Sequence, residues 1–284
     1  MKKLYFLIIC AVLMTCGACD ACTLFAATGS AYVKNGGTLI SKTRDWTPQY
    51  NGAKLYALHG KNAFYAIIAG DMKDSMSPRG GINDKGLAMV VASASSVPKD
   101  VLRKIPRKGN ITQDILSACD SVEEAVKNIN GYRGQFVLLA DRKEIALVEI
   151  SPEGIPDVKR IKSGYLYHTN HYVCDDFVKY NVKLGESSRT RFDRIGSLLT
   201  ESAKPFSIED FTSFTDDRHD GPVNSIWRVG DARHSIKTQA AFTVHISPDG
   251  DAEIFLKICK DPLFPKEFET IKIKSSEIFC SVNK

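Results

Sequence analysis

The order of strand-like and helical segments limits the fold of this chain more than any other feature. Runs rich in apolar and β-branched residues form three groups, and two groups with helical spacing separate them. The strand-like runs are residues 22–28, 38–42, 55–58, 63–68, 87–92, 135–140, 145–150, 158–161, 164–167, 239–246 and 252–258. Four segments have helical spacing: one that begins at Thr112, residues 122–129, residues 188–199, and a short helix after Ser207. Strands and helices do not alternate singly, and no glycine-rich phosphate loop is present. The order therefore predicts an α+β fold of layered antiparallel sheets rather than a doubly wound parallel sheet.

Turn and capping signals lie between these segments. Asn35-Gly36 predicts a hairpin turn between the first two strands, and residues 83–86 and 248–250 predict two further turns. Ser121 and Ser207 are each followed three residues later by an acidic residue, which is the pattern of a capping box at a helix start. We expect residues 47–62 and 71–80 to be loops that shape a substrate pocket.

The N-terminal residues have the pattern of a secretory signal peptide. Lys2 and Lys3 precede an uncharged apolar stretch over residues 4–14, and the small residues Gly17, Ala18 and Ala21 follow. The apolar stretch is shorter than the about 20 residues that a membrane-spanning helix requires. We therefore expect residues 1–21 to be removed and residues 22–284 to form a single domain, exported to the periplasm or secreted, with no membrane span.

Two cleavage sites compete within this leader. A cut after Ala21 makes Cys22 the first residue of the mature chain. A cut after Ala18 frees Cys19 instead, and residues 16–19 resemble a degenerate lipoprotein box in which Cys19 carries a lipid anchor. In that second case Cys22 becomes terminal only if the bond after Ala21 is later broken, for example by autoprocessing.

A terminal cysteine combines a nucleophile and a base in one residue. The thiol attacks, and the free α-amine accepts the thiol proton, so no neighbouring histidine is needed. An unperturbed α-amine titrates at about 7.7–8.0, close to the pH at which a general base is most useful. The position of Cys22 after a removable leader therefore predicts nucleophilic catalysis at this residue.

Composition excludes several other functions. The net charge is +5, and basic residues are scattered apart from a modest run over residues 99–108, which gives little support for nucleic-acid binding. His168 and His171 have no third ligand spaced to join them, so we expect no metal and no cofactor. Four later cysteines can pair as disulfides or remain buried thiols, and the sequence does not decide between these states: Cys119, Cys174, Cys259 and Cys280.

Five local motifs occur in a fixed order along the chain. They are Cys22-Thr23, SKTRDW at 41–46, NDKGL at 83–87, HTNH at 168–171 and SRTRFDR at 188–194. This ordered set resembles the N-terminal-nucleophile hydrolases of the choloylglycine hydrolase, penicillin V acylase and acyl-CoA:6-aminopenicillanic acid acyltransferase group. The resemblance extends over essentially the whole mature chain. It implies an αββα sandwich of antiparallel sheets and enzymes that cleave or transfer acyl groups at linear amides.

The resemblance also implies roles for individual residues. Cys22 resembles the nucleophile, and Asp45 resembles the aspartate that holds the terminal amine. Asn170 resembles the asparagine that donates to the tetrahedral oxyanion, where losing one such donor lowers the rate about 10²–10³-fold. Arg191 resembles the arginine near the nucleophile, where positive charge favours the thiolate.

This chain departs from the family pattern at two places. Where the group often has Arg-Asn-x-Asp, the sequence reads Lys42-Thr43-Arg44-Asp45, so either Lys42 or Arg44 supplies the cation and register favours Lys42. In the bile-salt branch a further asparagine follows the segment that corresponds to NDKGL. In this chain Ser93 lies near that position. This difference weakens a bile-salt assignment and leaves the oxyanion site with Asn170 and backbone N–H groups.

The sequence thus predicts an exported hydrolase of linear amides that acts through an acyl thioester on Cys22. Transfer of the acyl group to another amine is an alternative within the same chemistry. A lipid-anchored binding protein that keeps the fold without turnover is an alternative of another class, and a conventional Cys-His protease is a third. The substrate, beyond a small-molecule amide, and the oligomeric state remain open.

Overall fold

A computed structural model describes residues 21–57, 60–106, 108–232, 235–261 and 267–280. The expected signal peptide lies outside the described residues except for Ala21, as does position 58 of one expected strand. No helix in the described part of the chain is long and apolar enough to cross a membrane.

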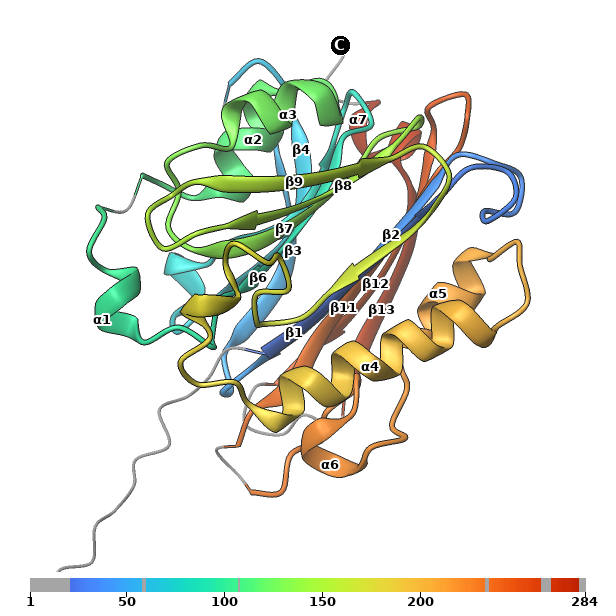
Figure 1. The fold of residues 1–284 in the computed structure, drawn as a ribbon. Coiled ribbons are helices and arrows are strands. Elements are labelled where there is room, and N and C mark those ends of the chain that lie inside the picture. Colours follow the sequence, from blue (N-terminus) through green and yellow to red (C-terminus); the bar gives the residue numbers. More distant parts are fainter. Residues whose placement is uncertain (1–20, 58–59, 107, 233–234, 262–266, 281–284) are drawn as a thin grey trace, which may run out of the picture.

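Two antiparallel sheets form the centre of the molecule (Figure 1). The six-stranded sheet has the order β10-β1-β2-β11-β12-β13. Its strands are β1 (Ala21–Thr28), β2 (Thr38–Trp46), β10 (Gly164–His168), β11 (Lys237–Ile246), β12 (Ala252–Cys259) and β13 (Phe268–Lys274). The seven-stranded sheet runs in sequence order from β3 to β9. Its strands are β3 (Tyr50–Tyr56), β4 (Phe64–Gly70), β5 (Ser77–Asn83), β6 (Ala88–Ser93), β7 (Gln135–Ala140), β8 (Ile145–Ile150) and β9 (Pro156–Ile161).

Helices cover the outer face of each sheet. In Figure 1, α2 and α3 lie over the seven-stranded sheet, and α4 and α5 lie over the six-stranded sheet. The helices are α1 (Lys99–Leu102), α2 (Ile111–Ala118), α3 (Val122–Asn128), α4 (Glu186–Glu201), α5 (Ile208–Thr215), α6 (Gly221–Asn224) and α7 (Ser275–Phe279). This arrangement of helix, sheet, sheet and helix is the αββα sandwich that the family resemblance predicts.

Strand β1 shows how the layers are held together. All of its residues are buried, because each face of the strand contacts a different apolar layer. Leu24 and Ala26 belong to the cluster between the two sheets, and Phe25 and Ala27 belong to the cluster beneath the helices. The alternation that puts successive side chains on opposite faces of a strand therefore serves two cores at once.

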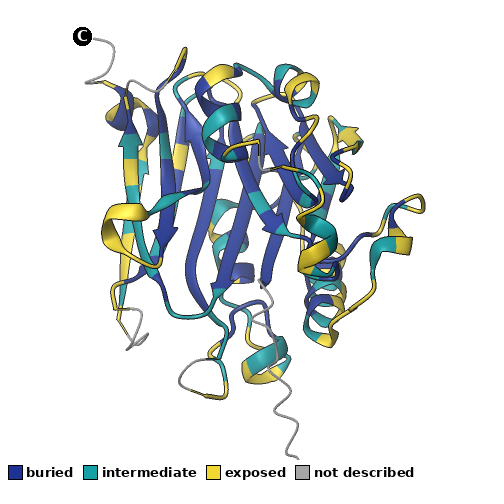
Figure 2. Ribbon diagram, turned by 90° about the vertical axis from the view of Figure 1, so that its left-hand side faces the viewer, coloured by how far each residue is buried: buried dark blue, intermediate teal, exposed yellow. Residues whose placement is uncertain are grey.

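The three apolar clusters correspond to the three interfaces between layers. Figure 2 shows buried residues running through the strands of both sheets, with exposed positions concentrated on helices and connections. Beneath α5, the ring of Phe211 lies 5.0 Å from that of Phe25, measured between centroids. On the other side, Ile115 of α2 and Val122 of α3 pack in one cluster with Val137 of β7. The five described cysteines are all unpaired.

Most of the predicted turns and helix starts are confirmed. Asn35 and Gly36 adopt positive φ values of 67° and 77° in the connection between β1 and β2. Ser207 forms the complete predicted capping box with Asp210 at the start of α5. At α3 the box is only half right: Ser121 accepts from the N–H of Glu124, but the Glu124 carboxylate accepts from the N–H of Asp120.

The prediction of two loops is partly wrong, because each contains a strand. β3 lies within residues 47–62, and β5 begins within residues 71–80. β5 contains a proline and two glycines, which have low strand propensity, so the sequence does not predict this strand. Gly81 is nevertheless required there, because a Cβ at this position would lie 2.4 Å from the carbonyl oxygen of Tyr65 in β4. Strand β13 was not expected either, and it forms by pairing with β12 at the sheet edge.

Candidate active site

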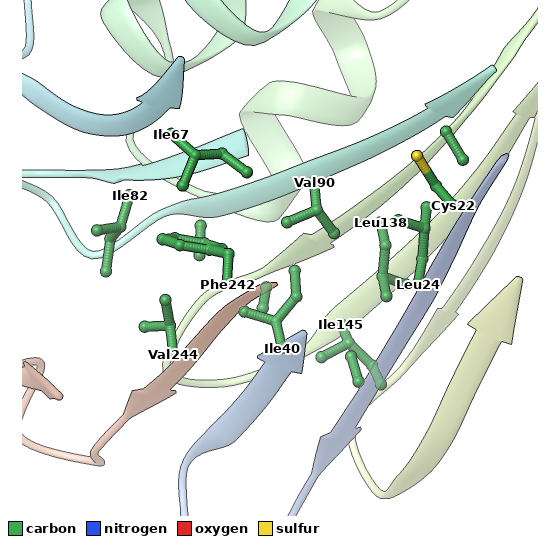
Figure 3. Close-up of a cluster of buried hydrophobic side chains, with 14 of the residues drawn as sticks. Cys22, Leu24, Ile40, Ile67, Ile82, Val90, Leu138, Ile145, Phe242 and Val244 are labelled. Atoms are coloured by element: carbon green, nitrogen blue, oxygen red, sulfur yellow. The ribbon is translucent and has the colours of Figure 1, made fainter. Parts of the chain in front are cut away.

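Cys22 lies at the start of β1, on the face of the strand that points toward the other sheet. It belongs to the apolar cluster between the sheets, together with Leu24, Val90 and Leu138, and is 5% exposed. Figure 3 shows its sulfur projecting from β1 into this layer. Because β1 pairs with β10 on one side and β2 on the other, the start of the strand occupies a fixed position.

The backbone of Cys22 is bound by two side chains from distant parts of the chain. The N–H of Cys22 donates to Oδ1 of Asn170 at 2.8 Å, and Nη1 of Arg191 donates to the carbonyl oxygen of Cys22 at 2.6 Å. Arg191 Nη2 also donates to Asn170 Oδ1 at 2.9 Å. Three of the predicted site residues therefore form one closed set of hydrogen bonds.

This set fixes the orientation of the Asn170 amide. Oδ1 receives two N–H donors, so the oxygen must face Cys22 and Arg191. The opposite end of the amide, Nδ2, donates to the carbonyl oxygen of Ser93 at 2.9 Å. Asn170 therefore contacts the nitrogen of Cys22 through its acceptor, and its donor is directed to the end of β6.

Arg191 is a buried residue on α4 rather than part of a solvated helix face. It is 1% exposed, and besides the contacts above it donates to the hydroxyl of Thr23 at 3.0 Å and to that of Ser187 at 3.3 Å. Burial lowers the pKa of Arg191 to about 10, with Asp45 acting in the opposite direction. The guanidinium therefore remains protonated at neutral pH.

Strand β2 brings the two candidate cations opposite the nucleophile. In the antiparallel register Arg44 faces Cys22 and Lys42 faces Leu24, so both side chains start on the face that points toward the other sheet. Lys42 is 2% exposed and donates to the main-chain oxygens of Val91 and, at 3.1 Å, Arg79. Burial lowers the pKa of Lys42, and Cys22 is the leading group that opposes this effect.

Arg44 is directed elsewhere. Its guanidinium donates to Oδ1 of Asn51 at 2.8 Å and to Oε1 of Gln49, and it lies 5.6 Å from the ring centre of Trp46. These contacts tie β2 to the start of β3. For Lys42, the second candidate cation, Cys22 is the group that most raises its pKa against the effect of burial.

Asp45 lies on the other face of β2 and pairs across the sheet with Ala21, the residue before Cys22. It is fully buried, and its Oδ1 accepts from the hydroxyl of Thr238 at 2.7 Å. Oδ2 has no hydrogen-bond partner among the described residues. Burial raises the pKa of this carboxyl, and Arg191 and Arg228 oppose the shift.

Ser93 contributes through its main chain. Its carbonyl oxygen is the acceptor for Asn170 Nδ2, as given above, and it is the last residue of β6. Any residue at this position offers the same carbonyl group. The serine at this position, near the register of the bile-salt branch's asparagine, therefore leaves this contact intact.

Sequence reasoning did not identify three residues that support the site. Ser188 Oγ accepts from the backbone N–H of Asn170 at 3.0 Å and lies 2.8 Å from Nδ1 of His171. Thr238 and Arg228 flank Asp45 from a strand and a loop far along the chain. Ser188 opens a motif that the resemblance identified, so its signal was present. Nothing local in the sequence marks Arg228 or Thr238.

The two histidines beside Asn170 have structural partners. His168 Nε2 lies 3.2 Å from Oε1 of Glu149, whose carboxylate also accepts from the N–H groups of Val173 and Cys174. Burial lowers the pKa of His171 to about 4, so that this ring is neutral near pH 7. Both histidines thus help to position the segment that carries Asn170.

Comparison with known proteins agrees with this fold. Penicillin V acylase from Agrobacterium tumefaciens is similar, with a TM-score of 0.51 and 18% identity over 88% of this chain and 85% of that chain. Two variants of conjugated bile acid hydrolase from Clostridium perfringens each give a TM-score of 0.56, at 13% and 15% identity. Those matches cover 89% and 88% of this chain and 92% of that protein. No curated protein matches this sequence.

A family model described as acyl-coenzyme A:6-aminopenicillanic acid acyl-transferase matches residues 33–254. The match begins after Cys22 and includes Lys42, Asp45, Asn170 and Arg191. It covers most of the chain and confirms the resemblance that the ordered motifs indicated. The chain therefore belongs to the acyl-coenzyme A:6-aminopenicillanic acid acyl-transferase family.

Proposed function

We propose that the mature protein is an exported hydrolase of linear amides, with Cys22 as its N-terminal nucleophile. The observation that carries this proposal is the position of the Cys22 nitrogen, which is bonded to Asn170 at 2.8 Å and held at the start of a buried strand. Its carbonyl group is held by Arg191. Removal of residues 1–21 then turns this nitrogen from an amide into an amine at the same place.

Asp45 is suited to hold the new amine. Ala21 pairs directly with Asp45 across the sheet, so removing Ala21 opens space beside the carboxylate. The free Oδ2 of Asp45 is a buried acceptor without a partner among the described residues. A new ammonium group at Cys22 would satisfy it, because a nearby opposite charge stabilises the charged form of both groups.

The proposed reaction has two stages. The amine of Cys22 takes the thiol proton, and the sulfur attacks the amide carbon to give a tetrahedral intermediate. The carbon–nitrogen bond then breaks, the leaving amine takes the proton from the ammonium, and an acyl thioester remains on Cys22. Water attacks the thioester with the same amine as base, releasing the acid and restoring the thiol.

Two groups can stabilise the intermediate. The buried Lys42 side chain lies on the sulfur's side of β2, and in its protonated form it places a positive charge there, although burial lowers its pKa. We assign the oxyanion donor to Asn170 Nδ2, which must exchange its bond with the Ser93 carbonyl for a bond to the oxyanion. Because Nδ2 must first give up this bond, we expect it to contribute less than the about 10²–10³ in rate of a fully preorganised donor.

Acyl transfer is the second candidate, since the matching family is described as an acyl-transferase. It uses the same thioester and differs only in the nucleophile that resolves it. A panel of N-acyl amines, penicillins, conjugated bile salts and N-acyl homoserine lactones, each assayed with and without an added amine, separates hydrolysis from transfer.

The decisive test compares chains that differ by one residue. A chain that begins at Cys22 should hydrolyse a substrate from the panel and show an acyl adduct on Cys22 by mass spectrometry. A chain that begins at Ala21, and the variant Cys22→Ala, should do neither. Cys259→Ala is the matched control, because Cys259 is also a buried thiol and should be dispensable. Full activity in a chain whose mass shows that Ala21 is retained contradicts the proposal, as does an exported form whose mass shows a lipid on Cys19 and retention of residues 20–22.

A further inference from the structure

A pocket of about 340 Å³ lies at the end of β6, close to the nucleophile and separate from it. Ser93 and Ala94 form one wall, and α1, the start of α2 and residues 132–135 form the others. Its lining contains five cationic side chains and no aspartate or glutamate: Arg79, Lys99, Arg103, Lys108 and Arg133. The whole chain has 38 basic and 33 acidic residues, so this local excess does not reflect composition.

Four of the five cations of this pocket have no carboxylate partner among the described residues: Lys99, Arg103, Lys108 and Arg133. Lys108 Nζ donates to the main-chain oxygen of Asn130 at 2.9 Å, and its ammonium lies 4.6 Å from the ring centre of Tyr132.

Neutral main-chain and ring groups are the contacts that hold Lys108 and Arg133. Arg133 Nε donates to the main-chain oxygen of Ile105 at 3.0 Å. The hydroxyl of Tyr132 donates to Asp114 at 2.9 Å, and Asp114 is not part of the pocket lining. A concave site with walls of one charge concentrates ions of the opposite charge, so the pocket is suited to an anion.

One segment connects the pocket to the nucleophile. The carbonyl oxygen of Ser93 accepts from Asn170 Nδ2, and Asn170 Oδ1 accepts from the nitrogen of Cys22. Ala94 lines the pocket and also belongs to the buried cluster that contains Cys22. Ser93 and Ala94 therefore contact both the cationic pocket and the residues around the thiol.

We propose that this pocket binds the anionic end of the amide substrate, a carboxylate or a phosphate. The inference rests on the proposed function, since it names the substrate class of the same site. Guanidinium groups bind carboxylate and phosphate through paired hydrogen bonds, which favours these two anions over halides. A volume of about 340 Å³ exceeds either group alone, so the pocket also takes part of the chain that carries the anion.

Matched substrate pairs test this assignment. One pair is an N-acylglycine and its neutral N-acylglycinamide, and the other is an O-phosphorylated N-acylethanolamine and its neutral N-acylethanolamine. The acyl group is the same in all four. For each pair the ratio of kcat/KM, anionic over neutral, should exceed about 10 at low salt and fall as salt screens the partly exposed cations. The pair with the larger ratio identifies carboxylate or phosphate.

Variants of the pocket identify where the preference arises. Arg103→Gln and Lys99→Gln should each lower the ratio about fivefold, the effect expected for one partly exposed ion pair. Arg142→Gln removes an exposed arginine at the turn between β7 and β8 and should leave the ratio unchanged. Inorganic phosphate should compete with the anionic substrate in the wild type and less in Arg103→Gln.

The outcomes separate the two proposals. If the chain that begins at Cys22 hydrolyses none of the four substrates and forms no adduct with any compound of the wider panel, the proposed function fails. If it hydrolyses both members of each pair equally, or if Arg103→Gln and Arg142→Gln give the same ratio, only the assignment of the pocket is overturned.

Discussion

Replacing Arg191 by methionine tests how the site is held together. Methionine has nearly the same helix propensity and a similar length, so the change removes charge and hydrogen bonds while α4 is preserved. Arg191 donates to four groups, of which the carbonyl of Cys22 and the hydroxyl of Thr23 lie in β1. These acceptors are buried, and water cannot replace the lost donor.

The expected loss of stability follows from these contacts. A hydrogen bond to a charged donor contributes about 1.5–3 kcal/mol, and removing one member of a buried ionic set typically costs about 3–5 kcal/mol. Asp45 keeps Arg228 as a neighbouring cation, which limits the damage. We therefore expect the free energy of unfolding to fall by about 4 kcal/mol. Arg191→Lys retains the charge without the paired geometry and should lose about half as much.

Urea unfolding followed by circular dichroism measures this loss. Arg189→Met is the matched control, because Arg189 lies two residues away on the same helix and is exposed. It should change the free energy of unfolding by less than about 0.5 kcal/mol. A loss below about 1 kcal/mol for Arg191→Met, or equal losses at both positions, would refute the reasoning.

Two further predictions concern His171, next to Asn170, and Ser207, at the start of α5. His171 has its pKa lowered to about 4, so the unfolded chain binds its proton more readily below about pH 6.5, and stability falls as pH decreases through this window. Between about pH 7.5 and 5 this one residue lowers the free energy of unfolding by about 2 kcal/mol. Urea unfolding at both pH values should therefore show a smaller change with pH for His171→Asn than for the wild type. An equal change in the two proteins contradicts the assignment. Ser207→Ala removes the hydroxyl that accepts from the N–H of Asp210, keeps the bond from the N–H of residue 207 to the Asp210 carboxylate, and should lower stability by about 1 kcal/mol. Ser202→Ala, at the end of α4, serves as its control in the same assay, and equal losses would argue against the cap.

The parts of the fold that the sequence predicts are those that depend on neighbours along the chain. Alternation and the Asn35-Gly36 turn are local properties, and they identify β1 and β2. β5 is formed despite its own composition, because hydrogen bonds on both sides outweigh the weak strand propensity of residues 78–81. The order of strands in each sheet depends on pairs such as Ser41 and Thr243, whose hydroxyls lie 2.7 Å apart although 202 positions separate them.

The same distinction applies to the candidate site. Cys22, Asn170 and Arg191 each lie in a recognisable motif, so the sequence named them, although only the fold shows that they contact one another. Thr238 reaches Asp45 because a bulge shifts the register of β11 against β2 next to this residue. A bulge depends on how two distant strands pair, and no pattern in residues 230–245 predicts it.

The placement of Cys22 within a strand makes the proposed enzyme intolerant of imprecise trimming. Successive residues of a strand advance about 3.3 Å, so one surplus residue would move the terminal amine by about that distance away from the Cys22 thiol. A cut after Ala18 would leave three surplus residues before the thiol. Ala21, the residue directly before Cys22, is paired with Asp45 and so belongs to the sheet itself. In the proposed enzyme, the accuracy of this cut would thus decide what fraction of the molecules can turn over substrate.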